Sequence, residues 1–176
     1  MENTNPLTLA EDGKNEYGKG NYKAAAALFS KAAQAYASMQ DVLNAAEMKN
    51  NESVALLQAG KAKEALQATD GTEDIFQKAG DVKRQGIAVS NRAAALEGLR
   101  KWQDALAEYD RAASLFEEGG EGDMHSVVRK AAANVNLKRG HVADSQMDVY
   151  DSLRLVERPT FSQRIMKFLM RIGLIR

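Results

Sequence analysis

Small and apolar residues recur along this chain at helical spacing and, over a longer distance, every 40 residues. In residues 82–99 and 102–116, apolar side chains repeat at intervals of three and four, which predicts two amphipathic helices joined by a short turn. The corresponding turns of the four copies align without gaps at Gly20, Gly60, Arg100 and Gly140. The pattern therefore predicts about four helical hairpins in series.

Three positions of the 40-residue period keep the same kind of side chain in each copy. One position is small, with Gly13, Ser53, Ala93 and Ala133. A second is also small, with Ala25, Ala65, Ala105 and Ser145, and a third is bulky, with Tyr36, Phe76, Phe116 and Val156. Small residues allow two helices to cross closely, and a bulky one fills the space toward the next pair. We expect all three positions to lie in the interior.

Composition supports an all-α fold. The chain has 29 alanines against 15 valines plus isoleucines, and its prolines are Pro6 and Pro159. We predict a right-handed α-solenoid of about four antiparallel helix pairs in residues 1–158, with units near 6–40, 41–80, 81–120 and 123–157. Residues 159–176 are predicted to form a basic amphipathic helix. Within the second unit, Asp70-Gly71 predicts a kink or break, either a hinge or a tolerated defect.

The third unit carries the clearest family signature, with Ala93, Trp102, Ala105, Tyr109 and Ala112 at fixed spacing. The first unit matches the same signature nearly as closely, with Gly13, Gly20, Tyr22, Phe29 and Ala32. This pattern resembles the tetratricopeptide repeat (TPR) family, in a long-helix variant with a 40-residue period, over residues 6–157. The second unit departs from it at Thr69 and Thr72.

The resemblance implies a non-catalytic adaptor or scaffold whose concave groove binds a peptide or helix of a partner protein. The groove positions fall on Lys14, Tyr17, Asn50, Asn51, Val54, Leu57, Gln58, Ser90, Asn91, Ala94, Glu97, Lys130, Asn134 and Lys138. Asn50, Asn51 and Asn91 either hold the main chain of a ligand or are simply solvated. The carboxylate-binding variant of the family is not expected, because Ala10, Ile87 and Val127 stand where it has lysines.

The tail is amphipathic and basic. Apolar residues fall on one helical face at Phe161, Ile165, Phe168, Leu169 and Ile172, and the cations are Arg164, Lys167, Arg171 and Arg176. Such a helix could cap the last hairpin, mediate self-association or contact a partner, or lie on a membrane surface. The alternative function is therefore a membrane-associated or self-assembling structural protein that acts through this tail.

Charge and side-chain chemistry exclude several classes of function. Residues 1–123 carry 14 basic and 20 acidic groups (net −6) and residues 124–176 carry 10 and 4 (net +6), so the chain is electrically polar. The chain lacks cysteine, and no catalytic or metal-binding constellation is visible, so neither an enzyme nor a cofactor is expected. His125 and His141 are expected to be surface or capping residues. The basic residues are not interleaved with aromatics, which argues against nucleic acid, and the absence of a signal-peptide pattern favours a cytoplasmic location.

Overall fold

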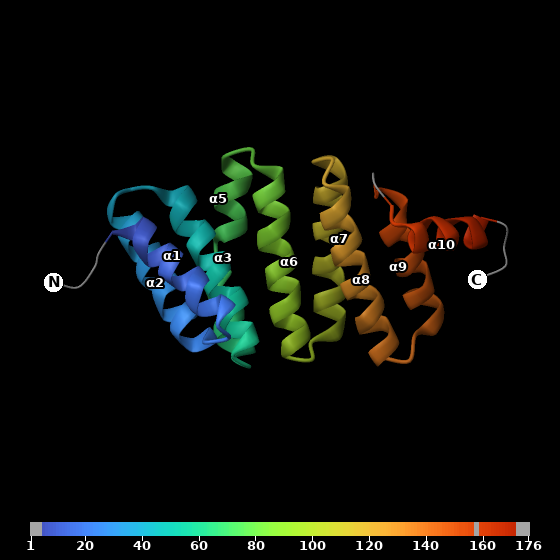
Figure 1. Ribbon diagram of the computed structural model, residues 1–176, viewed down its shortest axis with the longest axis horizontal. Helices are drawn as coiled ribbons and strands as arrows, with labels where there is room; N and C mark the ends of the chain where they lie inside the picture. Colours follow the sequence, from blue (N-terminus) through green and yellow to red (C-terminus); the bar gives the residue numbers. More distant parts are fainter. Residues whose placement is uncertain (1–4, 157–158, 172–176) are drawn as a thin grey trace.

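The computed structural model describes residues 5–156 and 159–171, apart from the side chains at 161 and 168–171. These residues form an all-α fold in which helices stand side by side from one end of the molecule to the other (Figure 1). The helices are α1 (Pro6–Gly18), α2 (Tyr22–Ser38), α3 (Val42–Gln58), α4 (Ala62–Ala68), α5 (Thr72–Lys78), α6 (Val82–Gly98), α7 (Trp102–Glu118), α8 (Gly122–Lys138), α9 (Val142–Arg154) and α10 (Phe161–Arg171). The predicted α-solenoid of helix pairs with a C-terminal helix is confirmed.

Seven turns between helices share one geometry and recur every 20 residues. A residue with positive φ ends each turn, at Gly20, Gln40, Gly60, Gly80, Arg100, Gly120 and Gly140. The amide that follows donates back to the carbonyl five residues earlier, as Asp41 does to Tyr36 at 3.0 Å and Lys101 to Leu96 at 2.9 Å. This is the Schellman arrangement, which satisfies the last carbonyls of a helix. The same turn is therefore used within hairpins and between them.

The repeating small and bulky positions lie in the interior, as predicted. Ala25, Ala65, Ala93, Ala105 and Phe76 are fully buried. Close packing at these crossings depends on small residues, because a Cβ added at Gly86 would lie 2.7 Å from Cε1 of Phe116. Val156, at the end of the last unit, is only half-buried.

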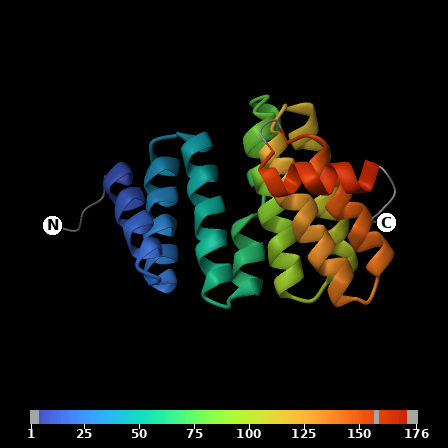
Figure 2. The same cartoon turned by 45° about the vertical axis from the view of Figure 1, so that its right-hand side comes forward.

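The predicted break at Asp70-Gly71 is also present. Helix α4 ends at Ala68 and α5 begins at Thr72, with Gly71 in the left-handed conformation at φ 74°. The buried Thr72 hydroxyl donates to the carbonyl of Thr69 at 2.8 Å. Figure 2 shows the two short helices following one another along one arm of the second hairpin. One long helix of the repeat is thus replaced by two short ones.

The spacing between neighbouring hairpins follows one repeat position in their second helices. That position holds Phe29, Thr69, Tyr109 and Val149. In the hairpin that carries Thr69, α3 packs directly against α6, whereas among the described helices α1 does not pack closely on α3, nor α6 on α8. A Cβ at Gly98 would lie only 2.9 Å from Cδ1 of Leu57, so the α3–α6 contact is tight. The first helices of neighbouring hairpins are therefore in contact in the middle of the solenoid and separated on either side.

Candidate functional site

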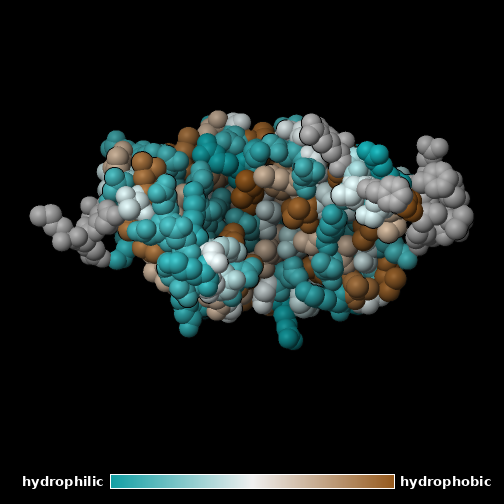
Figure 3. All heavy atoms as spheres, in the orientation of Figure 1, coloured by the Kyte–Doolittle hydropathy of each residue, from teal (hydrophilic) through white to brown (hydrophobic). Residues whose placement is uncertain are grey.

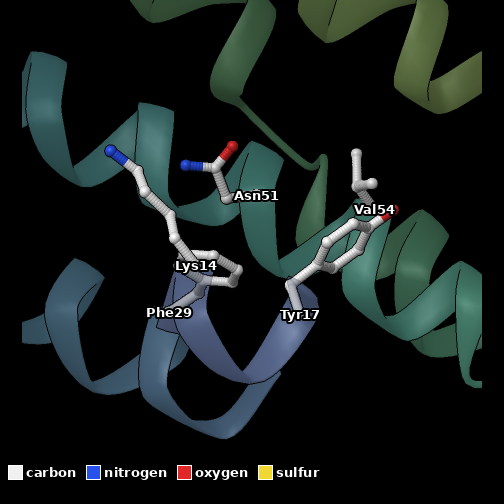
Figure 4. A pocket seen from close by; sticks show the side chains of 5 residues that line it. All are labelled: Lys14, Tyr17, Phe29, Asn51 and Val54. Carbon is white, nitrogen blue, oxygen red and sulfur yellow. The ribbon is translucent and has the colours of Figure 1, made fainter. Parts of the chain in front are cut away.

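A pocket of about 190 Å³ lies in the gap between α1 and α3. It is lined by Lys14 and Tyr17 of α1, Phe29 of α2, and Asn51 and Val54 of α3. Figure 4 shows Lys14 and Asn51 reaching into one side of the pocket, with Tyr17 and Val54 lining the other. Of these five residues, all but Phe29 are groove residues predicted from the sequence.

The walls of this pocket are set by local packing. Phe29 lies against α1 because residue 13 is glycine, and a Cβ there would be 2.8 Å from Cε1 of the ring. The Tyr17 ring packs edge-on against Tyr22, with 5.2 Å between centroids. Sequence reasoning placed Phe29 in the family signature but not in the site. The signal that could have found Phe29 was the aromatic position of the repeat.

The polar groups of the pocket are available to a ligand. Within the described residues, neither the Lys14 ammonium nor the Asn51 amide has a hydrogen-bond or ion-pair partner. The ammonium offers three donors, and the amide offers two donors and an acceptor. With Phe29, Tyr17 and Val54 beside them, the site joins an apolar pocket to a polar rim. Such a site suits an apolar side chain next to a carbonyl or carboxylate.

The equivalent gap between α6 and α8 is occupied by its own side chains. Glu97 accepts hydrogen bonds from the Tyr109 hydroxyl at 2.9 Å and from Lys138 Nζ at 2.8 Å. Burial, followed by the nearby Glu97 charge, raises the pKa of Tyr109, so its hydroxyl stays a donor. Two predicted groove residues, Glu97 and Lys138, are therefore brought together, but their polar groups are bonded to each other.

The other predicted groove residues are scattered. Asn50 is buried, with 4% exposure, and does not line the pocket. Ser90 donates its hydroxyl to the carbonyl of Ile87 at 2.9 Å. Asn91 is half-buried on α6, and exposed positions are held by Gln58, Lys130 and Asn134. In Figure 3, polar residues cover most of the face toward the viewer and hydrophobic residues appear in separate groups, so this face carries no continuous apolar trough.

The tail residues are described only in part. Arg164 and Ile165 are exposed on α10, and Lys167 is half-buried. The side chains of Phe161, Phe168 and Arg171 lie outside the described residues.

The expectation that both histidines lie at the surface or cap a helix is wrong for His125, which is fully buried in α8. Its Nε2 lies 3.5 Å from Oδ2 of Asp151, and within the described residues neither ring nitrogen has a hydrogen bond. Burial, reinforced by Arg129, lowers the pKa of His125. The repeat alignment held the signal, since the equivalent Ala45 and Gln85 are buried too. His141 is exposed at the N-cap of α9, as expected.

The described residues also bear on metal binding and membrane crossing. They contain no cluster of three or more His, Asp or Glu side chains able to hold a metal ion. None of the described helices has the length and hydrophobicity needed to cross a membrane.

Stacked helical hairpins of this kind define the class of helical-repeat solenoid proteins. The family model described as "Soluble NSF attachment protein, SNAP" matches residues 15–168, and the chain belongs to this family. Proteins of this family have a TPR-like helical fold and are adaptors that bind other proteins. The predicted class of helical-repeat protein is therefore confirmed. The match does not extend to the TPR family itself. No curated protein sequence matches the chain.

Proposed function

We propose that this protein is a non-catalytic adaptor that holds a segment of a partner protein in the gap between α1 and α3. The observation that carries the proposal is the pocket formed by Phe29, Tyr17 and Val54 with the unpaired polar groups of Lys14 and Asn51 at its rim. Membership of a family described as attachment proteins supports a protein partner. The α6–α8 gap is the weaker candidate, because Glu97 already accepts hydrogen bonds from Tyr109 and Lys138.

The pocket indicates the chemistry of the segment. Its volume of about 190 Å³ is comparable with an engineered cavity of about 150 Å³ that binds benzene. It therefore suits one aromatic or branched aliphatic side chain. Lys14 and Asn51 then take a main-chain carbonyl or a carboxylate beside that residue. The segment we expect is extended or helical, with an apolar anchor and an acceptor within a residue or two of it.

A peptide library displayed on phage tests this specificity with the full-length protein as bait. Selected peptides should share an apolar residue next to an acidic one or a free C-terminus. Their affinity, measured by isothermal titration, should fall at least about tenfold in Val54→Asp, because burying a carboxylate without a partner costs more than 1.4 kcal/mol. Lys14→Glu should weaken acidic peptides selectively.

Lys63→Glu is the matched control, because it makes the same charge change at an exposed position of α4 that does not line the pocket. Circular dichroism of each variant checks that the helices are intact. Equal affinity of the selected peptides for the wild type, Val54→Asp and Lys14→Glu would refute the α1–α3 gap as the binding site.

A further inference from the structure

The first turn of helix α10 is fixed by hydrogen bonds between Thr160 and Gln163. Thr160 follows Pro159, and its backbone N–H donates a hydrogen bond to the side-chain Oε1 of Gln163 at 2.7 Å. The backbone N–H of Gln163 in turn donates to the Thr160 hydroxyl oxygen at 3.4 Å. This reciprocal pair is a capping box, which fixes the first turn of a helix. The helix therefore has a local reason to form beyond any contact with the solenoid.

The apolar side of α10 faces away from the hairpins where the side chains are described. Ile165, near the centre of the apolar stripe, is 44% exposed, and Met166 is 38% exposed. Gln163 and Lys167, from the polar side, are half-buried. Helix α10 makes few contacts, mainly with α9, and lies across the C-terminal end of the row of helices (Figures 1 and 2). A helix that capped the core would show the opposite pattern of exposure.

The charge beside this stripe has one sign. Residues 158–176 contain Arg158, Arg164, Lys167, Arg171 and Arg176 and no acidic residue. The helix has 11 residues, which at 1.5 Å per residue is about 16 Å, too short for a hydrocarbon core of about 30 Å. An exposed apolar stripe flanked by cations is the pattern of a helix that lies in the interface of an anionic membrane.

We propose that α10 binds the surface of membranes rich in anionic lipid, with Ile165 and Met166 inserted and Arg164 among the headgroups. This activity is separate from the α1–α3 pocket and does not depend on it. Charge favours lipid over a second copy of the chain. Two-fold pairing of identical helices would place their cations together, whereas anionic headgroups neutralise them.

Flotation of the full-length protein with vesicles tests the proposal. The protein should bind phosphatidylserine–phosphatidylcholine vesicles, bind pure phosphatidylcholine vesicles much less, and dissociate as salt rises. Ile165→Asp should abolish binding, and Arg164→Glu should lower the partition coefficient roughly fivefold or more. Because both side chains are exposed, neither change should disturb the fold, which circular dichroism checks.

Leu137→Asp is the matched control, since Leu137 is an exposed apolar residue of α8 and lies outside α10. It should bind vesicles like the wild type. Equal binding by Ile165→Asp and the wild type, or binding indifferent to phosphatidylserine, would overturn the proposal. Sedimentation velocity measures whether the protein is a dimer. If the wild type is a dimer that Ile165→Asp dissociates, and neither protein binds vesicles, α10 mediates self-association and the proposal is wrong.

Discussion

At two turns of the solenoid the left-handed position is held by a residue with a side chain. Gln40 and Arg100 have φ values of 61° and 59°, whereas the other turns of this 20-residue series use glycine. A Cβ disfavours this conformation by about 1–2 kcal/mol, which is partly offset because glycine loses more backbone entropy on folding. These two residues therefore store strain that the other turns avoid.

Replacing either residue by glycine should stabilise the protein. We expect Gln40→Gly and Arg100→Gly each to raise the free energy of unfolding by roughly 0.5–1 kcal/mol. Urea denaturation measures the change. Gln77→Gly, at an exposed position inside α5, should lower it by about 1 kcal/mol, which separates a turn effect from a general effect of glycine. Destabilisation by Arg100→Gly would show that its side chain has another role.

His125 should make stability depend on pH. Its pKa is lowered from 6.5, mainly by burial and also by repulsion from Arg129 and Arg154, which together outweigh attraction by Asp151 and Glu117. The folded protein therefore holds the imidazole neutral at a pH where the unfolded chain binds a proton. This stability is complete above pH 6.5 and is lost as the pH falls, with a slope of at most about 1.4 kcal/mol per pH unit.

His125→Gln isolates this effect, because the equivalent position of the previous repeat is the buried Gln85. Urea midpoints of the wild type and the variant, measured between pH 5 and 7.5, should differ progressively as the pH falls. Asp148, whose pKa is raised mainly by burial, titrates in both proteins and cancels in the difference. A constant difference across this range would contradict a buried, neutral His125.

Among the elements, the α4–α5 arm should open most readily. Each of these helices has 7 residues, against 17 in the equivalent α7. The break at Gly71 interrupts the hydrogen-bond ladder, although Thr72 and Phe76 are buried. We expect amides of residues 68–74 to exchange faster than those of residues 108–114, which serve as the internal control, in hydrogen-exchange mass spectrometry. Equal protection of the two segments would show that the break causes no local opening.

The helices were predictable from the sequence because one turn geometry recurs with a fixed period. Residues 82–99 were expected as a helix, and α6 spans Val82–Gly98. The spacing between hairpins was not predictable, because it depends on how the sizes of Phe29, Thr69 and Tyr109 act across three helices at once. The α1–α3 pocket and the α6–α8 gap both lie beside an aromatic residue of this position, and they differ because Lys138 donates a hydrogen bond to Glu97 across the second gap. The sequence therefore assigned the groove positions to particular helices, but it did not show which of these residues lie together in the folded protein.

At the scale of the whole molecule, neighbouring hairpins support one another and α10 adds little. A solenoid is stabilised by its internal interfaces, so loss of a terminal element costs only what that element buries. The described part of α10 keeps Ile165 and Met166 exposed and packs mainly on α9, with few contacts. Its removal should therefore leave the hairpins intact.

A chain ending at residue 158 should unfold within about 2 °C of the full-length protein, because a loss of less than about 0.5 kcal/mol corresponds to a shift of that size. Thermal unfolding followed by circular dichroism measures it. A chain ending at residue 140 is the contrasting control: it loses α9, which buries Leu153 and Ser152, and should melt at least about 5 °C lower. A similar drop for the 158-residue chain would mean that α10 caps the solenoid, with its apolar side turned inward.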